Sequence, residues 1–299
     1  MKQRLSYFVG PTGAAYVFLL PAMAIFFIFM VIPLIASLVM GLFSIDIFLK
    51  NIKFVGLDNF TKLLGDDRFW NSLKNTLYFT VLEMPLQVAV GLIAAVLLSK
   101  PTKFRKALRT TYFIPVVCSL TAMGILWSML LDPNLGMIPY FFEKLGFPKI
   151  AFLKEPNLAM PTVAVMSVWK NFGFTMVILL AGIQGISESY YEAAEIDGAS
   201  KMKQFFHITI PLLIPALSFC IITNTIGCLQ VFDQVYVMTQ GGPLFRTETI
   251  VQYIYNAGFT LAPFDLGYAS AIAEVLLVII VVITLLMHRF FAKRETTEF

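Results

Sequence analysis

Residues 266–288 read LGYASAIAEVLLVIIVVITLLMH, a continuous apolar run whose one charged side chain is Glu274. A helix needs about 20 residues to cross a hydrocarbon core of roughly 30 Å. A membrane β-barrel would instead need alternation at period two over segments of about ten residues, which the run does not show. The run therefore predicts a membrane-spanning α-helix.

Five further apolar runs are also long enough to cross the membrane, at about 16–43, 76–99, 111–131, 158–184 and 208–232. The composition agrees, with 58% hydrophobic and 13% charged residues, where soluble domains average about 25% charged. A soluble core could not bury so much apolar surface. We predict an all-α membrane protein in which residues 1–299 form one domain of six transmembrane helices, with kinks at the prolines inside them.

The segment PTKFRKALR, residues 101–109, sets the predicted orientation because it holds four basic residues and no acid. Short loops rich in Lys and Arg stay on the cytoplasmic side. With six spans, both termini and the loop at 185–207 then also face the cytoplasm. Orientation alone explains these charges, so we predict membrane lipid and no nucleic acid as a partner.

The cytoplasmic loop contains an acidic stretch, SESYYEAAEIDGAS, at Ser187–Ser200. Ser189 and Glu192 have the spacing of a capping box, which predicts a helix over 190–197, and Gly198 is placed to end it in the left-handed conformation. Ala193 and Ala194 allow close approach of a partner, and Glu192 and Asp197 offer carboxylates to basic groups. The alternative is an interfacial helix that merely connects two spans.

The segment EAAEIDGASKMKQFFHITIP, Glu192–Pro211, resembles the EAA signature of binding-protein-dependent ABC importer permeases. That signature has EAA, three residues, Gly, nine residues and I-x-L-P, and this chain departs from it only in Ile210 for Leu. LLAGIQGI (179–186), VFDQVYVMTQGGP (231–243) and GYASA (267–271) are similar to the carbohydrate-uptake branch, in particular to its maltose/glycerol-phosphate-type first permease.

The resemblance implies a type I ABC importer permease fold and a coupling helix, Glu192, Ala193, Ala194, Asp197 and Gly198, that docks on a dimer of ATP-binding subunits. It also implies a second homologous permease as heterodimeric partner, an extracytoplasmic solute-binding protein, a carbohydrate substrate, and the cytoplasmic membrane of a bacterium or archaeon. The external loops at 44–75, 132–157 and 233–265 are long enough to receive the solute-binding protein.

The sequence contains no GxxxxGK[ST] motif for holding ATP phosphates. We therefore expect a transport subunit that is not an enzyme, with ATP and Mg bound by the partner ATPase and no cofactor in this chain. The cysteines and histidines have no metal-ligand spacing, so no metal site is predicted.

Three charged residues lie inside predicted spans, Glu83, Lys170 and Glu274. Each costs roughly 2.5–3.5 kcal/mol at a helix centre on insertion scales, so each is a candidate for function. Lys170 lies between Trp169 and Asn171, and an aromatic ring beside polar donors suits a sugar. The alternative for these three neighbours is a purely interhelical role. No partners are assigned to Glu83 and Glu274.

The fifth predicted span has polar or small residues at steps of three and four, Thr223, Gly227, Gln230 and Gln234, with Asn224 adjacent. They predict one stripe along a helix that either lines a substrate path or joins helices. The function that fits best is the permease subunit of an ATP-driven sugar importer working by alternating access. The alternative is an ion-coupled secondary transporter that uses Lys170, Glu83 and Glu274 as a relay.

Overall fold

The computed structural model describes residues 15–49, 52–100 and 102–295. The two chain termini, predicted to be cytoplasmic, lie outside the described residues. The contacts divide the chain into two compact units, residues up to 65 with 254–275, and residues 66–253 with those from 276 on. The single domain expected from the sequence remains a prediction.

Unit 1 combines a long apolar helix, Ala15–Met40, with a small antiparallel hairpin and short helices. The long helix contains a π-helical turn that ends two residues before Pro33, whose ring cannot fit against a regular preceding turn. The elements are η1 (Phe27–Val31), α2 (Ile32–Met40), β1 (Phe43–Ser44), β2 (Lys53–Phe54), α3 (Asp58–Leu64), η3 (Asn256–Thr260) and the start of α15 (Leu266–Glu295). Asn59 joins the chain after α2 to α3 by donating to the carbonyls of Gly41 and Phe43, each at 2.9 Å.

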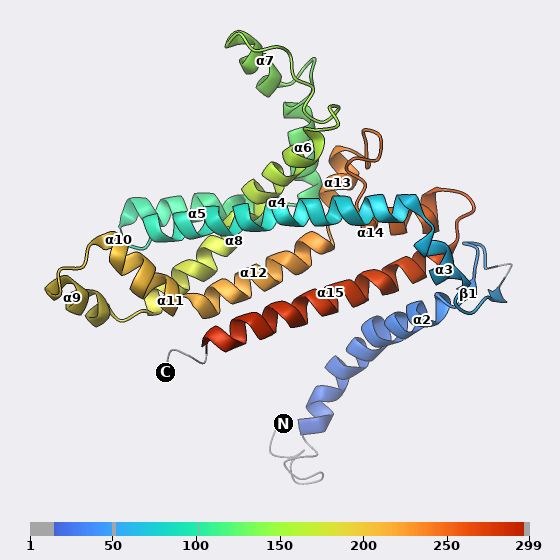
Figure 1. Cartoon of the computed structure of the whole chain (residues 1–299), viewed down its shortest axis with the longest axis horizontal. Coiled ribbons are helices and arrows are strands. Elements are labelled where there is room, and N and C mark those ends of the chain that lie inside the picture. The colour runs from blue at the N-terminus through green and yellow to red at the C-terminus, as the bar shows by residue number, and fades with distance from the viewer. Residues whose placement is uncertain (1–14, 50–51, 101, 296–299) are drawn as a thin grey trace. The chain divides into compact units, whose positions relative to one another are not determined.

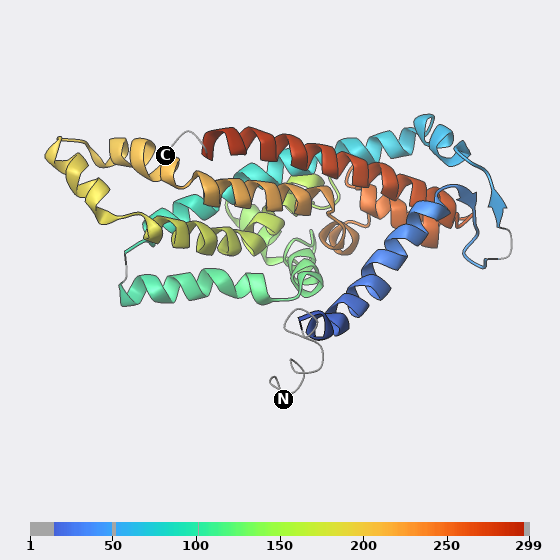
Figure 2. The same cartoon turned by 90° about the horizontal axis from the view of Figure 1, so that it is seen from below.

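Unit 2 is helical, and its helices α4, α8 and α12 pack on one another (Figure 1). Figure 2 shows α9 and α10 at one end of this unit. The elements are α4 (Asp67–Leu97), α5 (Lys103–Val117), α6 (Leu120–Leu130), α7 (Met137–Lys144), α8 (Ala159–Gly185), α9 (Glu188–Ile196), α10 (Lys201–Gln204), η2 (Phe205–Thr209), α11 (Ile210–Leu212), α12 (Ile214–Leu229) and α13 (Asp233–Met238). Helix α14 (Ile250–Tyr255), like α15, contributes residues to both units.

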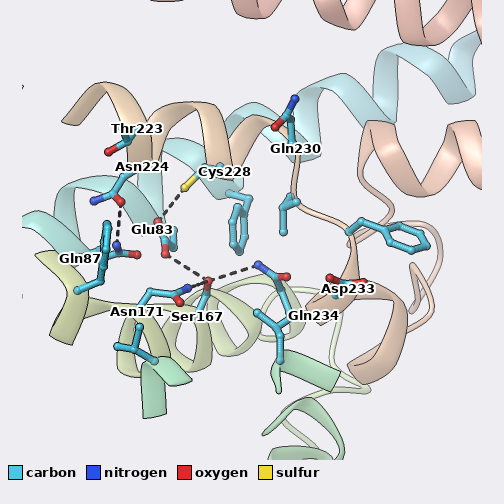
Figure 3. A pocket seen from close by; sticks show the side chains of 17 residues that line it. Glu83, Gln87, Ser167, Asn171, Thr223, Asn224, Cys228, Gln230, Asp233 and Gln234 are labelled. Carbon is cyan, nitrogen blue, oxygen red and sulfur yellow. Dashed lines mark hydrogen bonds between the residues drawn. The ribbon is translucent and has the colours of Figure 1, made fainter. Parts of the chain in front are cut away.

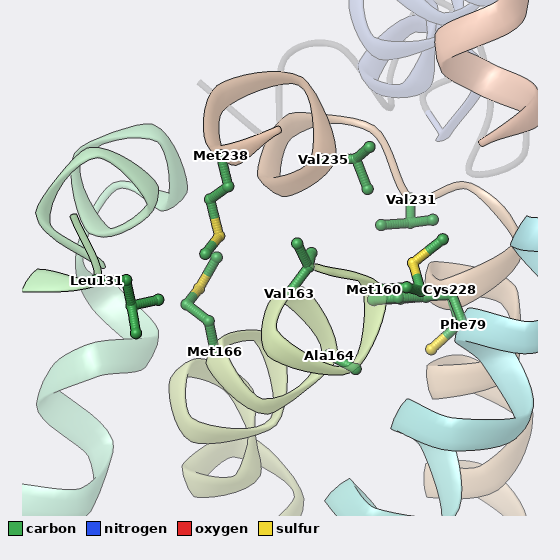
Figure 4. Packing of buried hydrophobic residues seen from close by; sticks show 10 residues of the cluster. All are labelled: Phe79, Leu131, Met160, Val163, Ala164, Met166, Cys228, Val231, Val235 and Met238. Carbon is green, nitrogen blue, oxygen red and sulfur yellow. The ribbon is translucent and has the colours of Figure 1, made fainter. Parts of the chain in front are cut away.

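Close helix packing in unit 2 depends on small residues where backbones meet. A Cβ atom at Gly173 of α8 would lie 2.2 Å from the Tyr112 carbonyl oxygen of α5, so no larger residue fits without moving the helices apart. Buried apolar side chains also pack between the helices of unit 2, and Met160, Val163 and Met166 of α8 form one cluster with Phe79 and Val235 (Figure 4).

Four described helices are long and apolar enough to span a membrane: Ala15–Met40, Asp67–Leu97, Ala159–Gly185 and Leu266–Lys293. Two bent pairs bring the number to as many as six. The second helix begins nine residues before the predicted 76, because the Asp66 side chain accepts hydrogen bonds from the amides of Arg68 and Phe69 and so caps it. The exact count of six spans remains a prediction.

The spans predicted at 111–131 and 208–232, with kinks at their prolines, are each occupied by a bent pair of helices. Helices α5 and α6 meet at 97°, because Cys118 and Ser119 are extended just after Pro115. The segment 201–212 meets α12 at 67°, where Pro211 and Pro215 flank the break at Leu213. Proline was expected to bend these spans, but here each bend divides its span into two helices.

Candidate functional site

Unit 2 contains a cavity of about 430 Å³ between α4, α8, α12 and the segment that follows α12 (Figure 3). The side chains that line it combine amides, hydroxyls and carboxyls with apolar and aromatic groups. They are Phe79, Glu83, Gln87, Val116, Leu120, Ser167, Asn171, Phe174, Thr223, Asn224, Gly227, Cys228, Gln230, Val231, Phe232, Asp233 and Gln234.

Several of the polar lining residues belong to two hydrogen-bonded groups. In the first, Glu83 accepts from the Ser167 hydroxyl at 3.2 Å and from the Cys228 thiol at 2.8 Å. The Gln234 amide donates to the same hydroxyl at 3.4 Å, so Glu83, Ser167 and Gln234 point toward one another (Figure 3). The Glu83 carboxyl group thereby joins α4, α8 and α12, and the Ser167 hydroxyl adds the N-terminal turn of α13.

The second group lies one helical turn further along α4. The Gln87 amide donates to Asn224 Oδ1 at 3.0 Å and to Thr175 Oγ1 at 3.1 Å, and Asn224 donates to the same Thr175 oxygen at 3.2 Å. This arrangement holds the amides of Gln87 and Asn224 in fixed orientations, each with further hydrogen-bonding capacity toward the cavity.

The structure brings together the polar residues predicted on the fifth span, but not as one helical stripe. Helix α12 ends at Leu229, Gln230 is its C-cap, and Gln234 belongs to the separate helix α13. Even so, Thr223, Asn224, Gly227, Gln230 and Gln234 all line the cavity. Because the chain turns after Leu229, the residues that follow α12 line the cavity. In a straight helix they would extend beyond the cavity.

Of the three neighbours predicted on α8, only Asn171 lines the cavity. Successive residues of a helix point about 100° apart, so the three side chains face different elements. Lys170 donates to the Val116 carbonyl in the last turn of α5 at 3.2 Å, where a cation meets the negative end of the helix dipole. Trp169 packs against Trp127 of α6, with ring centroids 5.6 Å apart.

The carboxyl groups that the sequence left without partners have different environments. Glu83 is 2% exposed and has the two donors named above. Glu274, in unit 1, lies against Gly41, where a Cβ atom would come within 2.2 Å of Glu274 Oε1. That oxygen is buried and has no hydrogen-bond partner among the described residues.

Gln87, Ser167 and Asp233 were not predicted as site residues. A signal was available for the first two, because Glu83 and Gln87 are four residues apart, as are Ser167 and Asn171. Residues at that spacing share one face of a helix. For Asp233 no such signal existed, since its position depends on where α12 ends.

A second candidate site is the exposed helix α9, predicted as the coupling helix. The predicted capping box is wrong, because the helix begins at Glu188 with Ser187 as its N-cap. Ser189 therefore lies in the first turn, and its hydroxyl is hydrogen-bonded to that of Ser187 at 2.8 Å. The extended backbone of Ser187 sets the start of the helix two residues earlier than the capping pattern predicted.

The predicted end of α9 is confirmed. Gly198 has φ +76°, the left-handed conformation. Its amide donates to the Glu195 carbonyl at 3.0 Å, and the next amide, of Ala199, donates to Ala194 at 2.8 Å. These two bonds form a Schellman motif, which satisfies carbonyls at the helix end.

The outer surface of α9 is available for contact. Glu192, Ala193, Asp197 and Gly198 are exposed and Ala194 is half-buried. Tyr191 faces inward and is hydrogen-bonded to Thr209 at 2.9 Å, which attaches α9 to η2. In the described part of the chain, neither Glu192 nor Asp197 has an ion pair or side-chain hydrogen bond.

The loop after α13, residues 239–250, contains the segment QGGP, residues 240–243, which is part of the resemblance described above. Its backbone is left-handed at Gln240, Gly241, Leu244 and Phe245. Glu248, 1% exposed, accepts two hydrogen bonds from the guanidinium of Arg68, at 2.6 and 2.7 Å. The loop is thus held by the N-terminal end of α4, while Leu244 and Phe245 stay exposed at its tip.

Comparison with known proteins shows that residues 87–296 match the family model "Binding-protein-dependent transport system inner membrane component". The chain is 36% identical over 285 residues to the lactose transport system permease protein LacF of Rhizobium radiobacter, covering 94% of each chain. It is 32% identical over 288 residues to the sulfoquinovosyl glycerol transport system permease protein SmoG of Agrobacterium fabrum, covering 96% of this chain and 93% of that one.

Among solved structures, the chain is similar to one from a bacterial alginate ABC transporter crystallised with an alginate pentasaccharide-bound periplasmic protein. The TM-score is 0.85 at 24% identity, with 99% of both chains covered. This likeness shows the fold.

Proposed function

Because the chain belongs to the family of binding-protein-dependent transport system inner membrane components, we propose that it is the permease subunit of an ATP-driven importer for a sugar, oligosaccharide or sugar derivative. The family and the apolar helices make it a multi-pass membrane protein. The proposal adds the cytoplasmic membrane of a bacterium or archaeon, six spans, cytoplasmic termini and import by alternating access.

The observation that carries the carbohydrate proposal is the lining of the cavity. Amides and hydroxyls can donate to and accept from sugar hydroxyls, and Phe79, Phe174 and Phe232 offer apolar faces to the ring. The volume of about 430 Å³ lies within the roughly 300–1,000 Å³ of small-molecule sites. Thr223, Asn224, Gly227, Gln230, Gln234 and Asn171 are the proposed substrate-path residues; Trp169 and Lys170 would act from behind them.

The energy for transport would come from ATP and Mg bound by a dimer of separate ATP-binding subunits. This chain would then be a transport subunit and not an enzyme. Helix α9 supports docking of such subunits, because its small and acidic side chains are exposed and its C-terminal end is fixed by backbone hydrogen bonds. Glu192, Ala193, Ala194, Asp197 and Gly198 would make the contact, with Glu192 meeting a basic residue of the ATPase. A second homologous permease would complete the pore, and a solute-binding protein would deliver the solute.

Transport by the complete system in proteoliposomes tests the proposal. The solute-binding protein is first screened against sugars by thermal shift, and the best ligand is used for uptake. We expect uptake that requires ATP inside and survives an uncoupler. Uptake that stops when the ion gradient is removed, with ATP unchanged, would instead favour the ion-coupled alternative.

Variants separate the two sites. Asn224→Leu, in the cavity, should reduce uptake more than tenfold while ATPase subunits still bind; Thr225→Val, next to it but outside the lining, is the matched control. Gly198→Asp should abolish uptake while the cavity stays intact. Normal uptake in Gly198→Asp would show that α9 is not the coupling element.

A further inference from the structure

Among the described side chains that line the cavity, the ionisable carboxyl groups are not matched by any basic group. Two are carboxyl-bearing, Glu83 and Asp233, five carry amides, and no Lys, Arg or His is among the lining residues described. Sites for anionic sugars supply Arg or Lys to the carboxylate, phosphate or sulfonate, because charge-assisted bonds must replace the lost hydration of the anion.

Lys170, on α8, does not fill that role. Its ammonium group donates to the Val116 carbonyl in the last turn of α5, and the side chain is buried between the two helices. Its positive charge therefore lies behind the lining residues, where the Val116 carbonyl and the negative end of the α5 dipole stabilise it.

The two carboxyl groups lie where a solute would meet them. Glu83 is in the wall, fixed by Ser167 and Cys228. These neutral donors satisfy it without any cation, so the site does not need a positive charge from the solute either. Asp233 is exposed and follows Gln230 by three residues at the turn between α12 and α13. An anion placed among these residues would meet hydrogen-bond acceptors and the negative charge of the exposed Asp233.

We propose that the solute is an uncharged sugar and that Glu83 and Asp233 disfavour anionic sugars. This proposal rests on the import function proposed above. Family membership does not decide the charge, since the relatives include a lactose permease and one for sulfoquinovosyl glycerol, a sulfonated sugar. The amides bind hydroxyl groups, and the carboxyl groups make the cavity unfavourable for carboxylated, phosphorylated or sulfonated sugars.

Two thiol reagents of similar size and opposite charge test the electrostatic preference of the cavity, with the full chain in membranes. In Gln230→Cys, the cationic trimethylammonium-ethyl and the anionic sulfonato-ethyl methanethiosulfonates are compared by initial rate. Peptide mass spectrometry locates the product, so the native cysteines remain. Relative to a small free thiol, the cationic reagent should be favoured by about tenfold. Adding Asp233→Asn should remove most of this bias; adding Glu143→Gln, an exposed acid on α7, should not.

A bias no larger than that of the free thiol, or one unchanged by Asp233→Asn, overturns the proposal. The second readout is uptake by the complete transporter of a neutral oligosaccharide and of its uronate counterpart. The proposal is supported if the neutral sugar is taken up preferentially and this preference becomes smaller in the double variant Glu83→Gln with Asp233→Asn. Preferential uptake of the uronate overturns the proposal but still agrees with sugar import. Uptake of neither, at any ATP concentration, overturns the proposed import function itself.

Discussion

The elbow at 185–207, which contains α9, and the loop at 239–250 both lie in unit 2, but they are fixed by bonds of different range. In the elbow the bonds are local, as between Gly198 and Glu195 and between Tyr191 and Thr209. In the loop, Glu248 is bound by Arg68, 180 residues earlier. The elbow can therefore keep its shape while exposing its surface, whereas the loop depends on the packed body of unit 2.

Further hydrogen bonds between α4 and the loop at 239–250 strengthen the contrast with the elbow. Asn75 donates to the carbonyls of Phe245 and Glu248, at 2.7 and 3.0 Å, and the Ile250 amide donates to Thr76 Oγ1 at 2.9 Å. These bonds hold Leu244 and Phe245 in left-handed backbone conformations that cost energy for residues with a side chain. The loop should respond to changes in α4, and the elbow should not.

The largest expected effect is from Arg68→Met. It leaves the Glu248 carboxylate buried without its cation, which costs about 3–5 kcal/mol when one partner of a buried pair is removed. Denaturant unfolding in detergent, with protease sensitivity of 239–250, measures it. Adding Glu248→Leu should recover much of the loss, and a cost below about 1 kcal/mol for the single change would show that the pair does not hold the loop.

Asn75→Ala should come next, at about 1–3 kcal/mol, since it removes the buried donor of the Glu248 carbonyl and one of the two side-chain donors to the Phe245 carbonyl. Asn71→Ala is the matched control, because Asn71 makes only one bond, to Phe245, at an exposed site. Equal thermal shifts for the two variants would contradict the role given to burial.

A smaller and more local effect is expected from Gly198→Ala. The residue must adopt φ +76°, which costs a side-chain-bearing residue about 1 kcal/mol. Hydrogen exchange at 194–199 should rise while 239–250 is unchanged. Gly185→Ala is the control, since Gly185 is the last residue of α8, has no left-handed backbone and has nothing near its Cβ position. Faster exchange in the loop would mean that the two regions are coupled.

The smallest effect is expected at the exposed pair of Lys201 and Glu195. The Lys201 hydrogen bond lowers the pKa of the Glu195 carboxyl. A lowered folded-state pKa stabilises the protein above the unfolded value, about 4.3, and this is lost as the pH falls through the folded value. Because water screens the pair, Glu195→Gln should leave the melting temperature unchanged near neutral pH. A clear drop there would show that α9 depends on more than its backbone cap.

Sequence alone was sufficient for the helical character, the positions of the long apolar runs, and the end of α9 at Gly198. In lipid every backbone polar group must be satisfied within the chain, so an apolar run of about 20 residues has little choice but a helix. A glycine at a helix end is likewise a local requirement. These features depend on neighbours in sequence.

Tertiary structure decided the rest, because it depends on which distant residues meet. Lys170 of α8 contacts the Val116 carbonyl of α5, 54 residues earlier, instead of lining the cavity. The end of α12 at Leu229 brings Asp233 to the cavity. The partners of Glu83 come from 84 and 145 residues away, and no sequence spacing specifies contacts set by the packing of helices.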